Sequence, residues 1–299
     1  MRKQQRTPHG GIARGQDSRC LVRWLLLTLL ITLGVARAQP PKQDPPKQRN
    51  EPLPKAAEPA VITALRSQGA LVERQGDAVV GLDLTAAKIT DASLEGLNAI
   101  VSLRRLELSG TPITNAALEK IKGLPKLTVL DLRQTAISDE GLPVIAELKT
   151  LEYLNLSATK VSSNLTPLAK LTALRTLDLS RTPLSDTAVA GLAGLKSLQT
   201  LSLQGTPIGD VGVGLLKELP SLSVLDLGNT KMGDAAADSL KELGNLSRLV
   251  VSGTQLSDKG LAKLKDAPAL KLVEAIGCKV TDQGIQTFQN GRPGTRVTH

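Results

Sequence analysis

Residues 127–132 read LTVLDL, and similar hexapeptides follow as LEYLNL at 151–156 and LRTLDL at 174–179. The fourth and sixth positions are apolar and the positions between them are mostly polar, which is the period-two pattern of a short strand with one buried face. The hexapeptide occurs nine times, at intervals of 24 residues except for one of 23, and it begins at Val79, Leu103, Leu127, Leu151, Leu174, Leu198, Leu222, Leu246 and Leu270. The sequence therefore predicts nine parallel strands.

A turn and a short helix follow each predicted strand. Eight residues after the start of most hexapeptides stands a threonine, whose hydroxyl can satisfy backbone groups where the chain leaves the strand. Pairs such as Ser138-Asp139 and Ser257-Asp258 come next and suit a helix start, where free N–H groups attract oxygen atoms and negative charge. Apolar residues then recur at helical spacing. Each repeat is therefore expected to be one strand, one turn and one short helix.

The pattern LxxLxLxxTxIxD, with a further Leu-x-x-Leu, resembles the leucine-rich repeat family over residues 79–291. The threonine or cysteine at the turn is similar to the cysteine-containing subclass of 24-residue repeats found in many bacterial exported proteins. This resemblance implies an α/β solenoid shaped like a horseshoe, with parallel strands on the concave face and short helices on the convex face. It also implies a scaffold that binds proteins without being an enzyme.

Three features depart from the regular repeat. The segment VSSNLTPL at 161–168 is one residue shorter and contains Pro167, so we expect its convex side to lose the α-helix. Residues 60–78 are expected to cap the N-terminal end with a helix and a hairpin whose second strand belongs to the first repeat. At the other end Phe288 is expected to cover the core, and residues 292–299 are expected to form a tail without a repeat pattern.

The first 59 residues have a different composition. A basic segment precedes the apolar run WLLLTLLITLGV at 24–35, and Ala36-Arg37-Ala38 follows as a cleavage pattern, so residues 1–38 are predicted to be a signal peptide. Its alternative is an uncleaved anchor, although the run is short for a membrane span. The proline-rich residues 39–59 are predicted to be a disordered linker, either a stalk or a simple leader. The rest of the chain is therefore expected to be extracytoplasmic, with no membrane span after cleavage.

Composition excludes several classes of function. The formal charge is +9, but seven Lys or Arg against one acid lie within residues 1–38, and only Tyr153 and Phe288 remain beyond them as aromatic platforms, so a nucleic-acid partner is not expected. His9 and His299 lie near the two ends, which argues against histidine-dependent enzymes. No cofactor or metal is expected, and Cys278 is interpreted as an inert thiol that replaces a turn threonine.

The inner face of the predicted sheet is the candidate binding surface. Six of the nine residues four positions after each hexapeptide start are acidic, and carboxylates stacked about 4.8 Å apart favour a cationic partner. Arginine and tyrosine side chains beside them are typical interface anchors. The alternative is that Asp in LDL is ordinary repeat sequence and that arginines neutralise it. The candidate residues that bind a protein partner are Asp83, Arg105, Glu107, Asp131, Arg133, Tyr153, Asp178, Asp226 and Arg248.

A second acidic row follows the turns. One acid per repeat at a helix start is explained by capping, and calcium requires six to eight oxygen ligands that converge on one point, so a calcium site is not expected. The row consists of Asp91, Asp139, Asp186, Asp210, Asp234, Asp258 and Asp282. Two functions remain open: an extracytoplasmic scaffold that binds a protein on its concave face, or a structural cell-envelope protein without a discrete ligand.

Overall fold

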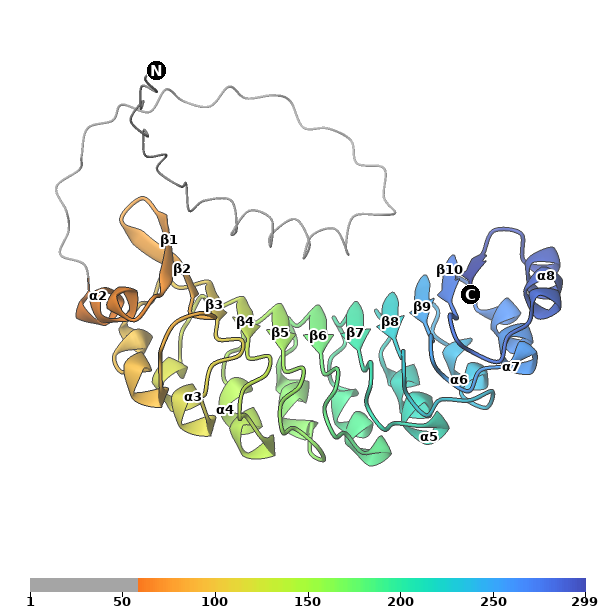
Figure 1. The fold of residues 1–299 in the computed structure, drawn as a ribbon, viewed down its shortest axis with the longest axis horizontal. Helices are drawn as coiled ribbons and strands as arrows, with labels where there is room; N and C mark the ends of the chain where they lie inside the picture. The colour runs from red at the N-terminus through yellow and green to blue at the C-terminus, as the bar shows by residue number, and fades with distance from the viewer. Residues whose placement is uncertain (1–58) are drawn as a thin grey trace, which may run out of the picture. The chain divides into compact units, whose positions relative to one another are not determined.

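The computed structural model describes residues 59–299, in which eleven strands form one sheet in sequence order (Figure 1). Strand β1 pairs antiparallel with β2, and every later neighbouring pair is parallel. The strands are β1 Leu71–Gln75, β2 Ala78–Asp83, β3 Arg105–Glu107, β4 Val129–Asp131, β5 Tyr153–Asn155, β6 Thr176–Asp178, β7 Thr200–Ser202, β8 Val224–Asp226, β9 Arg248–Val250, β10 Leu272–Glu274 and β11 Arg296–Thr298. These residues form a curved solenoid with the strands on its concave side, as expected.

The register of the sheet follows from the repeat. The middle residue of each three-residue strand is buried and its two neighbours are half-exposed in most strands, so that Leu106, Leu130 and Leu154 lie side by side inside the solenoid. The leucines of each hexapeptide belong to one continuous core, in which most are fully buried. An aliphatic core therefore runs the length of the solenoid.

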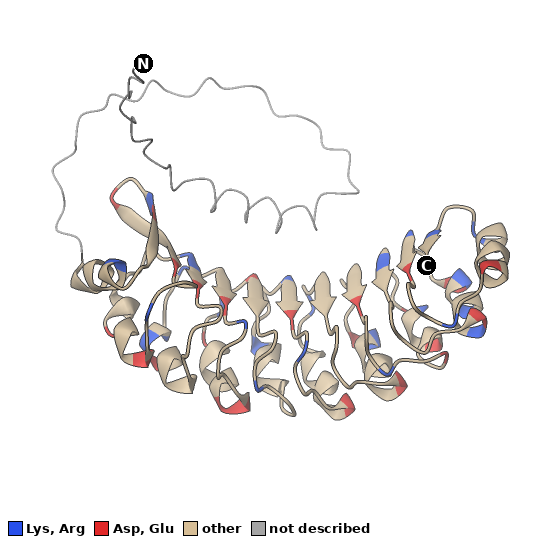
Figure 2. Ribbon diagram, viewed as in Figure 1, with Lys and Arg blue, Asp and Glu red and all other residues tan. Residues whose placement is uncertain are grey.

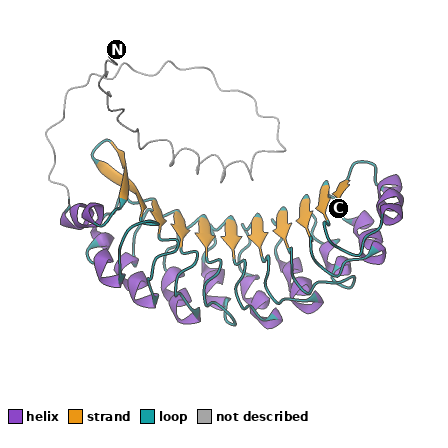
Figure 3. Cartoon of the chain, in the orientation of Figure 1, coloured by secondary structure: helices purple, strands orange, loops and turns teal. Residues whose placement is uncertain are grey.

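The convex side carries short helices, several of them 3-10 helices (Figure 3). The α-helices of residues 59–299 are α2 Ala60–Ser67, α3 Asn115–Ile121, α4 Leu142–Ile145, α5 Asp210–Gly214, α6 Ala237–Leu240, α7 Asp258–Lys263 and α8 Asp282–Gly291. The 3-10 helices are η1 Asp91–Leu94, η2 Leu97–Ala99, η3 Asp139–Gly141, η4 Thr166–Lys170, η5 Asp186–Leu192, η6 Leu215–Glu218 and η7 Leu264–Asp266.

The short repeat loses its α-helix, as predicted, and forms the 3-10 helix η4 with Pro167 in its first turn, a position that an α-helix also tolerates, as α4 shows. The same replacement occurs in repeats of regular length, for example at η5 and at η1 and η2. The expectation of one helix per repeat was too simple, since η3 runs into α4 and α5 runs into η6. Only a few convex residues are available in each repeat, and their 3-10 turns fit the tight spacing of the coils.

Residues 60–83 cover the N-terminal end of the core. Helix α2 buries Ile62 and Leu65 completely, and its chain then enters the β1–β2 hairpin. Strand β1 is mostly exposed, whereas β2 buries Val79 and Leu82. The helix and hairpin thus close the solenoid with a polar outer edge.

The C-terminal end differs from the expectation in one respect. Phe288 in α8 is 3% exposed and covers the core, as predicted. Residues 292–299 are not a tail without pattern, because β11 pairs in parallel with β10 and buries Val297. The parallel part of the sheet therefore has ten strands, one more than the nine hexapeptides predicted.

The buried threonines at the turns satisfy backbone carbonyls, as predicted. Thr111 Oγ1 donates to Leu108 O at 2.5 Å and Thr135 Oγ1 donates to Leu132 O at 2.6 Å, and four further repeats have the same bond. In the ninth repeat the Sγ of Cys278 donates to Val251 O at 3.0 Å. Each bond fixes the chain where it leaves the strand.

The predicted signal peptide, 1–38, and all of the predicted linker, 39–59, except Pro59 lie outside the described residues. Within residues 59–299, no helix has the length and apolar character needed to cross a membrane.

Candidate functional site

The nine residues predicted to bind a partner all lie on the sheet or directly after a strand on its concave side. Charged residues are spread along the strands of this face (Figure 2). Glu107 and Asp131 are register partners on β3 and β4, and Asn155 continues the row on β5. The others occupy these positions: Asp83 on β2, Arg105 on β3, Arg133 after β4, Tyr153 on β5, Asp178 on β6, Asp226 on β8 and Arg248 on β9.

The aspartates of this row have a structural role that sequence reasoning missed. Asp131 Oδ1 accepts a hydrogen bond from the backbone N–H of Arg133 at 2.9 Å, which ends the strand in an Asx turn. Asn155 makes the same bond to the Ser157 N–H at 2.9 Å. The other aspartates with this bond are Asp83, Asp178 and Asp226. An amide thus serves this turn as well as a carboxylate, and the negative charge is not needed for it.

The concave arginines fall into two groups. Arg105 pairs with Glu107 at 3.1 Å, and Arg248 pairs with Glu274 at 2.7 Å. These two pairs agree with the interpretation that arginines neutralise neighbouring acids. Arg133 differs, since its Nε donates to Ser109 Oγ at 3.1 Å, and among residues 59–299 it forms no ion pair.

The middle of the face has an unfavourable concentration of negative charge. Burial raises the pKa of Asp226, and the charges of Asp178 and Glu274 raise it further, although the Gly228 N–H acts in the opposite direction. Burial also raises the pKa of the Tyr153 phenol, with the charges of Asp131 and Asp178 adding to the effect. A positive charge placed against β6–β8 would relieve this repulsion.

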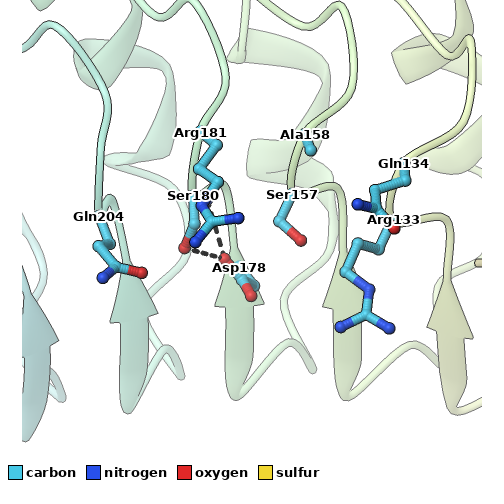
Figure 4. A pocket seen from close by; sticks show the side chains of 8 residues that line it. All are labelled: Arg133, Gln134, Ser157, Ala158, Asp178, Ser180, Arg181 and Gln204. Atoms are coloured by element: carbon cyan, nitrogen blue, oxygen red, sulfur yellow. Dashed lines mark hydrogen bonds between the residues drawn. The ribbon is translucent and has the colours of Figure 1, made fainter.

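A shallow polar notch of about 220 Å³ lies at the carboxyl ends of β4–β6 (Figure 4). Two of the predicted residues, Arg133 and Asp178, line it, and the structure adds six that sequence reasoning missed. The notch is lined by Arg133, Gln134, Ser157, Ala158, Asp178, Ser180, Arg181 and Gln204.

Each repeat from β3 to β10 turns through the left-handed backbone region one residue before the threonine or cysteine. Glycine occupies this position in four repeats, at Gly110, Gly205, Gly253 and Gly277. In the other four a residue with a side chain has φ between 54° and 56°: Gln134, Ala158, Arg181 and Asn229. Asparagine tolerates this conformation well, but the other three are uncommon there and carry backbone strain. All three strained residues line the notch. In the sequence, the glycines at the same position of other repeats indicate that this turn is left-handed.

The second acidic row does more than cap helices. Asp234 accepts hydrogen bonds from the backbone N–H and hydroxyl of Ser257, in the next repeat, at 2.7 and 2.6 Å. The Ser257 hydroxyl in turn accepts from the Lys259 N–H and caps α7, as predicted for the hydroxyl of such a pair. Burial raises the pKa of Asp234, but the hydrogen bonds from Ser257 and from the Gly260 N–H, with the charge of Lys263, together lower it more, so that the net shift is downward.

We call the whole series of such bonds the inter-repeat ladder. Each acid of the row except Asp282, which bonds to His299, accepts from the residue 23 positions later, and Asn115 does the same in the repeat that lacks an acid. The bonded pairs are Asp91–Thr114, Asn115–Ser138, Asp139–Ser162, Asp186–Gly209, Asp210–Gly233, Asp234–Ser257 and Asp258–Thr281.

The ladder is interrupted in the short repeat, where Ser185 N–H bonds only to the backbone carbonyl of Ser162. The carboxylates of the inter-repeat ladder accept hydrogen bonds from the next repeat and so join neighbouring repeats. Within residues 59–299, no group of three or more His, Cys, Asp or Glu side chains is arranged to hold a metal ion.

Comparison with known proteins places these features in context. The profile described as "Leucine-rich repeat region" matches residues 79–210, and "Leucine rich repeat" matches residues 196–256. No curated protein matches the chain.

Among solved structures, internalin C2 of Listeria monocytogenes is similar with 25% identity and a TM-score of 0.55, over 80% of this chain and 92% of that chain. The Arabidopsis receptor kinase HAESA ectodomain, in complex with an IDA peptide hormone ligand, has 21% identity and a TM-score of 0.53 over 70% of this chain. The plant peptide hormone receptor RGFR1, in complex with RGF2, has 21% identity and a TM-score of 0.50 over 71% of this chain. This chain spans 40% and 33% of those two receptor chains.

Proposed function

Because the chain belongs to the leucine-rich repeat family, we propose that it is an extracytoplasmic scaffold that binds a protein partner on its concave face. Proteins that share this fold bind protein or peptide ligands, as the two plant receptor complexes illustrate. The signal sequence predicted for residues 1–38 supports the location. The scaffold does no chemistry on its partner.

The observation that carries the proposal is the charge left on the concave face over β6–β8. Asp178 and Asp226 repel each other, which raises the pKa of Asp226 in addition to the effect of burial. The turns do not require these charges, since Asn155 forms the same turn without one. A cationic segment of the partner would therefore gain attraction to carboxylates that cost the free protein stability.

The test removes charge while it keeps the turns. We would cross-link the full chain to its neighbours in the extracytoplasmic fraction, identify the captured protein and measure its affinity. The Asp131→Asn, Asp178→Asn, Asp226→Asn triple variant keeps an acceptor at every turn and is expected to bind about tenfold more weakly. The matched control neutralises three exposed acids of the helical side, Glu119→Gln, Glu140→Gln and Glu242→Gln, and is expected to bind as the parent does.

Equal binding by both triple variants would contradict recognition at the concave acids. Failure to capture any protein would instead favour a structural cell-envelope element without a discrete ligand.

A further inference from the structure

The notch at the carboxyl ends of β4–β6 has the construction of a small binding site. Ser157 and Ala158 are two of its lining residues, and Ala158 is the small member of a row in which Gln134 and Arg181 are the neighbours on either side. A short side chain between two long ones leaves a gap in the row (Figure 4).

Ser157 is a buried residue with an unused hydroxyl. The residue is 5% exposed, and its backbone N–H and carbonyl are both hydrogen-bonded, to Asn155 Oδ1 and from the Gln134 N–H. Among residues 59–299, however, no group forms a hydrogen bond with Ser157 Oγ. Figure 4 shows this hydroxyl directed into the space between Asp178 and Arg133. Since this oxygen is not one of the fully buried, unpaired side-chain atoms, it is accessible from the notch and can donate a hydrogen bond to a ligand there.

The walls of the notch carry two cations that are not neutralised. Elsewhere on the concave face Arg105 and Arg248 each pair with a glutamate. Within the described part of the chain, neither Arg133 nor Arg181 forms an ion pair. Guanidinium groups only donate hydrogen bonds, so the two side chains call for an acceptor.

Arg181 also occupies a backbone conformation that does not suit it. Its φ is 56°, whereas the next repeat makes the same turn with Gly205 at 68°. A Cβ on Gly205 would lie 3.4 Å from Arg181 Cγ, which is van der Waals contact, so the two turn positions are direct neighbours. The turn itself favours glycine at this position, and strain of this kind is often kept where a side chain serves a function.

One carboxylate, Asp178, lies in the same notch. Its Oδ1 accepts hydrogen bonds from the Ser180 N–H at 2.8 Å and from the Ser180 hydroxyl at 2.5 Å. The two arginines and this one aspartate give the notch a formal charge of +1. An anion is thus favoured over a cation at this point, in contrast to the acidic surface farther along β6–β8.

We propose that the notch binds a carboxylate of the protein partner, an aspartate or glutamate side chain held between Arg133 and Arg181 with the Ser157 hydroxyl donating to it. This inference rests on the proposed function, because it assumes that a protein docks on the concave face. The partner then presents an acidic residue to β4–β6 beside a basic segment that faces β6–β8, and this order of charges fixes its direction along the sheet.

The experiment uses the full chain labelled with 15N-arginine and needs no knowledge of the partner. Acetyl-glutamate methylamide is added while the Nε–Hε signals of the arginines are followed by NMR, and acetyl-glutamine methylamide is the uncharged control. Saturable shifts of the Arg133 and Arg181 signals are expected with glutamate, at about 1–50 mM for a single charged contact. Arg181→Gly, which installs the residue that other repeats use at this turn, should abolish the shift of the Arg133 signal. Ser157→Ala should weaken binding several-fold, and Arg296→Gln, at an exposed arginine on β11 outside the notch, should leave it unchanged.

Absence of saturable shifts, equal shifts with the glutamine compound, or unchanged binding by Arg181→Gly would overturn the assignment of the notch. Because the probe is a small molecule, such a failure would leave the capture of a partner by the concave acids intact. Conversely, loss of partner capture would not alter the titration of the notch.

Discussion

The repeats of β4–β6 and the repeats on either side of them share one backbone but use it differently. The flanking repeats of β3, β7, β9 and β10 turn at glycine, that of β8 turns at Asn229, and the concave arginines Arg105 and Arg248 are paired with glutamates. The central repeats turn at Gln134, Ala158 and Arg181, leave Arg133 and Arg181 without ion pairs in the described chain, and contain the interruption of the inter-repeat ladder. Features that stabilise the fold thus dominate at the flanks, and they are relaxed where the polar notch lies.

This difference indicates that the irregular repeats of a regular solenoid point to the region that binds a partner. Each coil contributes similar stability, so a departure that costs stability in one coil is tolerated by the others. The departures in this chain cluster in the central repeats. That clustering is the reason to assign binding to the centre of the sheet.

Breaking the ladder in a flanking repeat is expected to have the largest effect. Asp234→Ala removes two charge-assisted hydrogen bonds to Ser257 and should lower the free energy of unfolding by about 2 kcal/mol at pH 7. Asp234→Asn keeps an acceptor, as Asn115 does in its own repeat, and should lose less than half as much. Urea unfolding followed by circular dichroism measures both.

This loss should depend on pH with a defined sign. Burial raises the pKa of Asp234, but the hydrogen bonds from Ser257 and the Gly260 N–H and the charge of Lys263 together lower it more, so the folded-state pKa lies below the unfolded one. The stabilisation is therefore complete above about pH 4, the unfolded pKa, and is lost as the pH falls through the folded pKa. If the difference in free energy of unfolding between the parent and Asp234→Ala grew as the pH fell, the stabilising role of the ladder would be contradicted.

Exchanging the turn residues of the two regions should have an intermediate effect. Gly110→Ala places a Cβ in open space at φ 71°, so only backbone strain is added, and the free energy of unfolding should fall by about 1 kcal/mol. Ala158→Gly removes the same strain at φ 54° and should leave stability unchanged within about 0.5 kcal/mol, because glycine also gains entropy in the unfolded chain. The denaturation midpoints of the two variants test this prediction. A larger loss of stability for Ala158→Gly than for Gly110→Ala would contradict the difference between the central and flanking repeats.

Neutralising one concave acid should have the smallest effect. Burial, Asp178 and Glu274 raise the pKa of Asp226, so the folded state binds its proton more tightly than the unfolded state does. Stability then falls as the pH rises from the unfolded pKa, near 4, through the folded pKa. Asp226→Asn keeps the acceptor for the Gly228 N–H and should gain about 0.5 kcal/mol at pH 7, with no gain below about pH 4. Thermal unfolding at the two pH values measures the difference, and a loss at pH 7 would show that the charge stabilises the fold.

The fold was largely predictable because one period governs it. The hexapeptides locate β2–β10, and the buried threonines and Phe288 follow from their place in the repeat. Strand β11 was missed since its only apolar residue is Val297, although this residue stands 24 positions after Val273 and continues the period. Convex elements were less predictable, because the few residues in each form either an α-helical or a 3-10 turn, and the spacing of the stacked coils determines which.

The candidate site was predictable in position and only in part in chemistry. Alternation along the strands places all nine predicted residues on the concave side, but it does not show which arginine meets which acid. Arg105 and Arg248 are paired by contacts to Glu107 and Glu274, and sequence alone does not give these contacts. Arg181 was missed because its turn position was not recognised as left-handed, although Gly205 and Gly253 at the same position indicate it.

The most direct test of the difference between the two regions is the free energy of unfolding of Arg181→Gly, measured beside its reciprocal, Gly205→Arg. If Arg181 is kept for binding at the expense of the backbone, Arg181→Gly will be at least as stable as the parent, and Gly205→Arg will be less stable by about 1 kcal/mol. A clear loss of stability in Arg181→Gly would show that Arg181 serves the fold, and would contradict the assignment of binding to the central repeats.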